Sequence, residues 1–279
     1  MRSTLTALRK KLAAGRKLSM LTCYDASFAR VFDEAGVDCL LVGDSLGMVV
    51  QGRDSTLPVT VADIAYHVAC LQRGSPRAFL LADLPFGSYQ EGPTQALRNA
   101  VTLMQAGAQM VKVEGGAELA PTVELLVRSG IPVCGHVGLL PSHVHALGGF
   151  RVQGKAQAEA ERIVVDAQAL EAAGAAMLVI EAVPEPVGRA VCEQTSLITI
   201  GIGASPACDG QVLVLHDMLG VTASPAKFVK NYMAGASTRG DAVADAVRRY
   251  VEEVASGAFP GPEHVYGAAA EAVPRIYGA

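Results

Sequence analysis

Short runs of apolar residues recur along this chain, and five of them follow a segment with helical spacing that ends in a glycine. Examples are EAGVDCLLVGD, QAGAQMVKVEGG and EAAGAAMLVIEA. The glycines, Gly36, Gly74, Gly107, Gly130 and Gly174, stand where a helix C-terminus favours a residue in the left-handed conformation. The runs are continuously apolar rather than alternating, which is typical of parallel strands covered on both faces.

Eight such runs predict eight strands: SMLTCYD, CLLVGD, AFLLAD, MVKVEG, PVCGHVG, AMLVIEA, LITIGIG and VLVLHD. Helical segments separate most of them, and one opens with the capping pattern Thr60-x-x-Asp63. This order predicts an α/β fold of the (β/α)₈ TIM-barrel type. A doubly wound sheet is the alternative, but no G-x-G-x-x-G follows the first strand. We expect residues 1–279 to form a single barrel domain, with an N-terminal helical segment and a C-terminal helical tail from about Ala234.

Composition narrows the class of protein. The 279 residues are 51% hydrophobic, which is enough for one large α/β core. A net charge of -4 gives no basic field to attract nucleic acid or an anionic membrane. No apolar run approaches the ~18 residues of a membrane span, and the basic N-terminus lacks the apolar stretch of a secretory signal. The six cysteines form no C-x-x-C pair, so we expect reduced thiols and a cytoplasmic location.

Acidic residues gather at the ends of the predicted strands. Strand C-termini in this fold face the active site. Asp and Glu make up 27 of the 279 residues, so eight strand ends should carry about one acid by chance. The second, third, fourth and sixth strands end on Asp44, Asp83, Glu114 and Glu181, while Asp25 and Asp217 follow the first and eighth. Any one of them is as consistent with a turn or a helix cap as with a ligand, but the group together indicates a functional site.

Two further polar residues lie at the predicted strand ends. Lys112 is two positions before Glu114, so both side chains face the same side of one strand. A lysine in an apolar strand needs a negative partner, either Glu114 in a structural pair or the anionic group of a substrate. His136 lies at the mouth of the fifth strand, where a lone histidine is more often a structural group than a catalyst.

Three carboxylates without clustered His or Cys ligands favour a hard cation. Mg²⁺ is the first choice, with Mn²⁺ or another divalent ion as alternatives. An α-keto acid chelated to such an ion is activated for removal of the proton next to its ketone. Glu181, at the rim, is the candidate base.

Several motifs together resemble ketopantoate hydroxymethyltransferases. They are LVGDSLGMVVQGRDSTLPVTVADIAYH, LLADLPFGSY, GAQMVKVEGG, IPVCGHVGLLP, GGFRVQG and DGQVLVLHDMLG, in the family's order from about Leu21 to Met233. The resemblance implies a (β/α)₈ barrel and a decamer of two pentameric rings. It also implies transfer of a one-carbon unit from 5,10-methylenetetrahydrofolate to 3-methyl-2-oxobutanoate (α-ketoisovalerate). The product, ketopantoate, serves pantothenate and coenzyme A biosynthesis.

The resemblance assigns roles to individual residues. It implies that Asp44, Asp83 and Glu114 surround Mg²⁺ and that Glu181 accepts the proton. The substrate-binding positions that it implies are Asp44, Ser45, Asp83, Lys112 and His136.

One loop departs from the family pattern. After the seventh strand, where the family has G-I-G-A-G, this chain has GIGASPACDG, so Ser205 replaces a glycine and Pro206 follows. A positive φ at that position would strain Ser205, and Pro206 favours an extended conformation there. The loop shape and nearby folate contacts are therefore the places where this chain is expected to differ.

Two other functions fit parts of the pattern. A Mg²⁺-dependent carbon–carbon lyase of the isocitrate-lyase type also enolises a keto acid, but its K-K-C-G-H motif is absent here. A barrel that has lost catalysis would be expected to lose one of the four strand-end acids, and all four are present.

Overall fold

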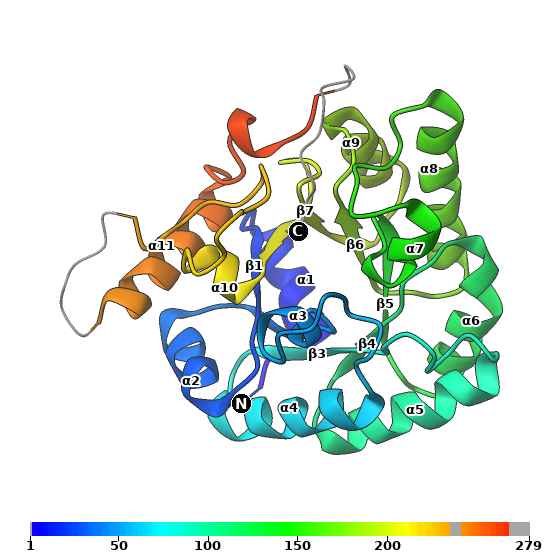
Figure 1. Cartoon of the computed structure of the whole chain (residues 1–279), viewed down its shortest axis with the longest axis horizontal. Helices are drawn as coiled ribbons and strands as arrows, with labels where there is room; N and C mark the ends of the chain where they lie inside the picture. The colour runs from blue at the N-terminus through cyan, green and yellow to red at the C-terminus, as the bar shows by residue number, and fades with distance from the viewer. Residues whose placement is uncertain (1, 235–240, 268–279) are drawn as a thin grey trace.

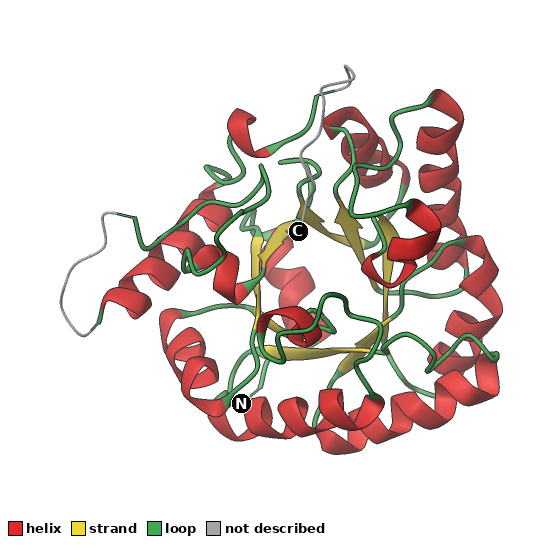
Figure 2. Ribbon diagram, in the orientation of Figure 1, coloured by secondary structure: helices red, strands yellow, loops and turns green. Residues whose placement is uncertain are grey.

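The computed structural model describes residues 2–234 and 241–267, in which eight parallel strands close into a barrel surrounded by helices (Figure 1 and Figure 2). Neighbouring strands follow the sequence order, and β8 pairs with β1 to close the ring. The strands are β1 (Leu18–Thr22), β2 (Cys39–Val42), β3 (Phe79–Asp83), β4 (Met110–Lys112), β5 (Val133–Gly138), β6 (Met177–Glu181), β7 (Ile198–Ile202) and β8 (Gly210–Leu213). The predicted TIM barrel is confirmed.

Helices cover the outside of this barrel. The longer ones are α1 (Leu5–Ala13), α2 (Ala26–Ala35), α4 (Val61–Gly74), α5 (Pro93–Ala106), α6 (Ala120–Arg128), α8 (Gln157–Ala172), α9 (Glu185–Gln194) and α11 (Ala242–Ser256). Short helical turns in the connections are α3 (Leu46–Val49), η1 (Ala117–Leu119), η2 (Pro141–His143), α7 (Val144–Leu147), α10 (Leu215–Met218) and η3 (Pro262–His264).

Burial explains why the strands lack polar alternation. Every strand residue except Gly138 is buried, because the helices cover one face and the barrel interior covers the other. The parallel register aligns functional positions across the strands. Asp83 on β3 is opposite Lys112 on β4, and Gly138 on β5 is opposite Glu181 on β6. The strand ends thus bring charged residues together at one rim.

Most of the predicted helix ends are confirmed. The Thr60 hydroxyl accepts a hydrogen bond from the Asp63 backbone N–H at the start of α4, and the Asp63 carboxylate accepts one from the Thr60 N–H. Four of the five glycines expected to be left-handed have a positive φ, namely Gly36, Gly107, Gly130 and Gly174.

The expectation for Gly74 is wrong, because its φ is not positive and it is the last residue of α4. A Cβ at this position would lie 2.3 Å from the carbonyl oxygen of Ala26, the first residue of α2. Glycine is needed here for the close approach of two helices, not for a turn.

The two chain ends cover different parts of the barrel. Figure 1 shows α1 behind the strands, across the end of the barrel away from the viewer, as the predicted N-terminal helical segment. The predicted C-terminal helix is α11. Residues 235–240 and 268–279, which the prediction also covered, lie outside the described part. The Tyr250 hydroxyl on α11 lies 2.7 Å from the carbonyl oxygen of Met20 on β1 and 2.8 Å from that of Gln211 on β8. The helix therefore fastens the seam where the barrel closes.

The expectations about the cysteines, membrane spans and domain number can also be compared with the structure. All six cysteines are free thiols. Within residues 2–234 and 241–267, no helix has the length and apolar character needed to span a bilayer. The assignment of residues 1–279 to one domain stays a prediction.

Candidate active site

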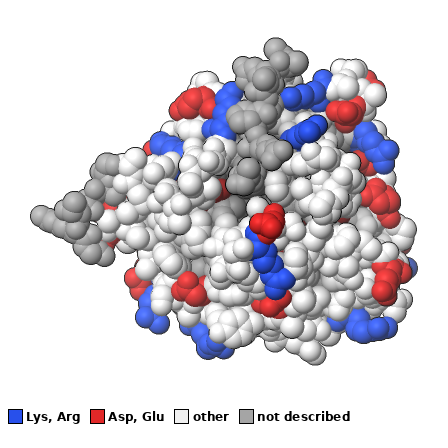
Figure 3. Space-filling view, viewed as in Figure 1, with Lys and Arg blue, Asp and Glu red and all other residues white. Residues whose placement is uncertain are grey.

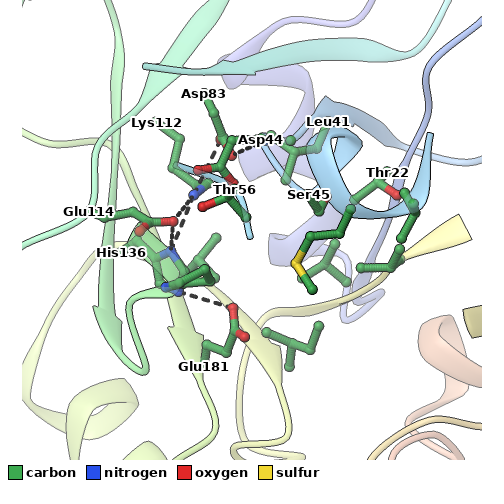
Figure 4. Close-up of a pocket in the computed structure, with 18 of the residues that line it drawn as sticks. Thr22, Leu41, Asp44, Ser45, Thr56, Asp83, Lys112, Glu114, His136 and Glu181 are labelled. Carbon is green, nitrogen blue, oxygen red and sulfur yellow. Dashed lines mark hydrogen bonds and ion pairs between the residues drawn. The ribbon is translucent and has the colours of Figure 1, made fainter. Parts of the chain in front are cut away.

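Three carboxyl groups meet at the C-terminal rim of the barrel (Figure 4). Asp44 follows β2, Asp83 ends β3 and Glu114 follows β4. Each offers one oxygen, and these oxygens all lie within 4.8 Å of one another. All three side chains are buried, and the Asp44 backbone N–H donates a 3.0 Å hydrogen bond to Oδ2 of Asp83. Consecutive parallel strands bring the acids together because their C-terminal ends lie side by side.

Lys112 is the buried cation beside this cluster. Its Nζ lies 3.3 Å from Oδ1 of Asp83 and 3.2 Å from Oε1 of Glu114. A lysine in an apolar strand needs a negative partner, and Lys112 has two, Glu114 and Asp83. Burial lowers the pKa of Lys112, but the charges of Asp83, Glu114 and Asp44 outweigh burial and raise it well above its ordinary value. Lys112 therefore stays protonated.

One ammonium does not neutralise three carboxylates. Burial and the charges of Glu114 and Asp83 raise the pKa of Asp44 well above its ordinary value. The pKa of Glu114 is lowered instead, because Lys112 and hydrogen bonds from its neighbours outweigh its burial. A site with this excess of buried negative charge and only oxygen donors fits a hard divalent cation.

His136 joins the cluster to Glu181. Its Nδ1 lies 3.3 Å from Oε1 of Glu114, and its Nε2 lies 3.3 Å from Oε2 of Glu181, the last residue of β6. Burial and the Lys112 ammonium lower the pKa of His136. The hydrogen bonds to the two glutamates outweigh them, so that the net shift is upward. Each ring nitrogen thus lies beside a carboxylate, and Nδ1 also lies 3.2 Å from Nζ of Lys112.

Ser45 lies next to the cluster at the start of α3. Its Oγ is 2.9 Å from the hydroxyl of Tyr24. A Cβ on Gly43 would lie 2.9 Å from this Oγ and 3.6 Å from Oδ2 of Asp83. Glycine at position 43 therefore leaves the space between the serine and the acids open.

The other two strand-end acids have different places. The Asp25 carboxylate accepts hydrogen bonds from the backbone N–H groups of Ser27 and Phe28 and caps α2. Asp217 is buried on α10 and lines the same pocket as the cluster, on the β8 side. Asp25 is thus a helix cap, one of the structural roles considered for a strand-end acid, whereas Asp217 is part of the pocket.

Some residues of the site were not found from the sequence. Ser142 on η2 donates two hydrogen bonds to Oε2 of Glu114, from its backbone N–H (3.0 Å) and its hydroxyl (2.6 Å). It directly follows the motif IPVCGHVGLLP, which is the only sequence signal for it. Ala182, directly after Glu181, has a φ of 48° and is the single non-glycine residue with positive φ among those described. The surrounding structure holds Ala182 in this strained conformation, which sequence patterns do not report.

The strain expected at Ser205 does not arise. Its φ is not positive, and the left-handed residue of this loop is Gly203. Ser205 is buried, its hydroxyl donates a 2.9 Å hydrogen bond to Glu185, and it accepts one of 3.0 Å from the backbone N–H of Ala207. These two hydrogen bonds hold the Ser205 side chain within the loop.

Comparison with known proteins decides the family. Residues 2–262 match the sequence profile described as ketopantoate hydroxymethyltransferase. The chain belongs to the ketopantoate hydroxymethyltransferase family. A 3-methyl-2-oxobutanoate hydroxymethyltransferase of Dechloromonas aromatica is 59% identical over 96% of this chain and 97% of that protein. One of Aromatoleum aromaticum is 56% identical over 94% of this chain and 96% of that protein.

Two solved structures resemble this chain in fold at low sequence identity. A phosphoenolpyruvate phosphomutase from Streptomyces platensis subsp. rosaceus has a TM-score of 0.59 at 13% identity, over 78% of this chain and 83% of that one. A 2,3-dimethylmalate lyase, a member of the PEP mutase/isocitrate lyase superfamily, has a TM-score of 0.58 at 17% identity, over 79% of this chain and 81% of that one. These likenesses concern the fold alone. The resemblance stated from the motifs, and the hydroxymethyltransferase class that it implied, are confirmed by the closer relatives.

Proposed function

We propose that this chain transfers a hydroxymethyl unit from 5,10-methylenetetrahydrofolate to 3-methyl-2-oxobutanoate, with the keto acid held at the carboxylate cluster. The product would be ketopantoate, for pantothenate and coenzyme A biosynthesis. The observation that carries the proposal is the convergence of Asp44, Asp83 and Glu114 within 4.8 Å inside the pocket. The relatives at 56–59% identity are named for this reaction.

Asp44, Asp83 and Glu114 would hold Mg²⁺, or another divalent ion of similar hardness. When bound, the ion supplies a Lewis acid that stabilises negative charge on the ketone oxygen of the acceptor. Ser142 keeps Glu114 in place through the two hydrogen bonds to Oε2, while Oε1 faces Lys112 and His136.

Ser45 and Lys112 would orient the acceptor. The space beside Gly43 is open, so the Ser45 hydroxyl can donate to an oxygen of the keto acid's carboxylate. Lys112, fixed between Asp83 and Glu114, adds positive charge on the same side. These contacts would hold the substrate carboxylate and turn the carbon next to the ketone towards β6.

Glu181 would take the proton from that carbon. It ends β6 across the pocket from the cluster, with Oε2 directed at Nε2 of His136 (Figure 4). His136 would position this carboxylate. The deprotonated carbon then attacks the methylene carbon of the co-substrate, and the complete transfer consumes one water and releases tetrahydrofolate.

The test is proton exchange at the acceptor carbon. Glu181→Gln should slow the exchange of the C3 proton of 3-methyl-2-oxobutanoate in D₂O by about 10²–10⁴-fold, measured by NMR, because it removes the base. Mg²⁺ affinity should stay within about twofold, because Glu181 is outside the carboxylate cluster. Glu193→Gln, an exposed change on α9, is the matched control. Normal exchange in Glu181→Gln would reject the assignment.

Assembly and location belong to the same proposal. The family resemblance supports a decamer of two pentameric rings. A biosynthetic role and six reduced cysteines support a cytoplasmic location.

A further inference from the structure

The pocket has two chemically different walls. The carboxyl groups of the cluster and of Glu181, and the amine of Lys112, come from the sector between β2 and β6. The rest of the pocket, formed by β7, β8 and α3, is largely apolar, with Ile202, Val212 and Met48 among its lining residues. The machinery that holds the keto acid therefore leaves one apolar side of the pocket unused.

Asp217 is the charged group on this apolar side. The side chain is 97% buried, since only 3% of the residue's surface is exposed, and it lines the pocket. Its Oδ1 accepts a hydrogen bond from the Thr222 hydroxyl, while Oδ2 accepts none from the described residues. Burial and the nearby charge of Glu181 raise the pKa of Asp217 although Thr222 opposes the shift. Because Asp217 lines the pocket, a ligand there can supply the donor that its second carboxyl oxygen lacks.

A surface groove continues this side of the pocket outwards. Met48, Val49 and Thr222 line both the pocket and the groove, so the two are connected. The groove runs between α3 and α10, with Arg53 at its outer part beside Asp54. Figure 3 shows that the face above the barrel is mostly uncharged, with a few charged side chains near its centre. The cleft therefore offers a passage, partly lined by Met48, Val49 and Val221, that begins at a buried acid and ends beside an exposed cation.

We infer that the reduced pterin ring of the one-carbon donor lies against this apolar wall, with Oδ2 of Asp217 accepting hydrogen bonds from its N3–H and 2-amino group. The inference rests on the proposed function. The pterin is flat, has apolar faces and carries two adjacent N–H donors on one edge, which a carboxylate oxygen matches. Its methylene carbon must reach the acceptor carbon near Glu181, and Asp217 faces the same pocket as Glu181.

The rest of the donor follows from this placement. With the pterin edge at Asp217, its aminobenzoyl-glutamate tail leaves along the groove past Val221. Arg53 is the cation that would meet the tail carboxylates, with Asp54 reducing its net effect. Asp217 is thus expected to decide recognition of the pterin, and Arg53 to adjust affinity for the tail.

The test compares two ligands in two proteins. The probes are 5-formyltetrahydrofolate and its analogue with a 2-methyl in place of the 2-amino group, and binding is measured by calorimetry with the Mg²⁺-loaded protein. The normal protein should bind the amino probe at least tenfold more tightly. Asp217→Asn places an amide N–H₂ against the ligand's donors, so it should weaken the amino probe at least tenfold and the analogue, which keeps only the N3–H donor, clearly less. Retained discrimination, or equal loss of both probes, would overturn the inference.

Two controls separate this result from other failures. Asp245→Asn, on α11 away from the pocket, should change neither probe. Exchange of the acceptor's C3 proton without folate reports the keto-acid site alone. Its absence in the normal protein would count against the proposed function and not against the pterin site.

A second variant tests the inference if Asp217→Asn does not fold. Arg53→Gln is an exposed change that leaves the core intact. It should weaken 5-formyltetrahydrofolate about threefold and leave the corresponding reduced pteroate, which lacks the glutamate, unchanged. An unchanged affinity for both probes would place the tail elsewhere and overturn the groove assignment.

Discussion

At the scale of single residues, Asp44 shows most directly that the site needs a cation. Its pKa is raised by burial and by the charges of Glu114 and Asp83. The folded chain therefore holds this proton more strongly than the unfolded chain. The contribution of Asp44 to stability is fully present below the ordinary pKa near 3.8 and is lost as the pH rises towards the raised value. At neutral pH without metal, burial of Asp44 beside the other acids therefore opposes folding.

Asp44→Asn should accordingly stabilise the metal-free protein. In EDTA at pH 7 we expect the free energy of unfolding to rise by on the order of 1 kcal/mol, because one buried charge is removed from the cluster. In Mg²⁺ the advantage should disappear, since the variant loses a ligand. Urea unfolding in both buffers measures the change. A less stable variant in EDTA would contradict the electrostatic account.

Ser142 should affect the metal through Glu114. Ser142→Ala removes the 2.6 Å hydrogen bond from the hydroxyl to Oε2 of Glu114 but leaves the one from the backbone. We expect Mg²⁺ affinity to fall about tenfold, because groups that orient metal ligands typically contribute at this level. Calorimetric titration with Mg²⁺ measures it. Ser129→Ala, an exposed serine bonded only to the carbonyl of Leu125, is the matched control and should bind Mg²⁺ normally.

At the scale of elements, the ends and contacts of helices depend on different kinds of information. The capping box at Thr60 and Asp63 is a local pattern, so it was predictable. The contact between the last residue of α4, Gly74, and the first residue of α2, Ala26, joins positions distant in the chain. A left-handed helix end and a close helix contact both select glycine, and the sequence does not distinguish them.

Gly74→Ala tests this contact. The added Cβ would lie 2.3 Å from the Ala26 carbonyl oxygen, which is backbone and cannot rotate away. We expect a loss of about 1–3 kcal/mol in the free energy of unfolding, as for overpacking in a core. Gly36→Ala is the comparison, because the space around it is open and only its positive φ of 86° resists the change. It should cost about 1 kcal/mol, and equal urea midpoints with the normal protein for Gly74→Ala would contradict the close contact.

At the scale of the whole molecule, closing the barrel brings the first and last strands together. Tyr250 on α11 is buried at this seam, with its hydroxyl within hydrogen-bonding distance of both strands. Tyr250→Phe should therefore destabilise the fold by about 1–2 kcal/mol, the usual effect of losing a buried hydrogen bond. Tyr66→Phe, on a side chain that is 67% exposed, should have no measurable effect on urea unfolding. Equal stabilities of the two variants would show that α11 does not fasten the seam.

The proposed assembly has its own measurement. Light scattering should give a mass near ten times the 28.9 kDa of one chain. A mass of one or two chains would reject the decamer without affecting the assignment of the cluster.

Much of this protein is determined by local sequence. Continuous apolar runs between helical segments gave the eight strands and the barrel, because parallel strands buried on both faces need such runs. The acids at the strand ends followed, since the fold directs those ends to one rim. Asp44, Asp83 and Glu114 meet there as the sequence predicted.

The tertiary structure alone decided which polar groups share the site. Asp25 and Asp217 have equivalent positions in the sequence pattern, yet one caps α2 and the other is buried in the pocket. Ser142 reaches Glu114 across 28 positions of sequence, and Ala182 is held in a strained conformation by its surroundings. These features depend on contacts between distant segments, and local patterns carry no information about such contacts.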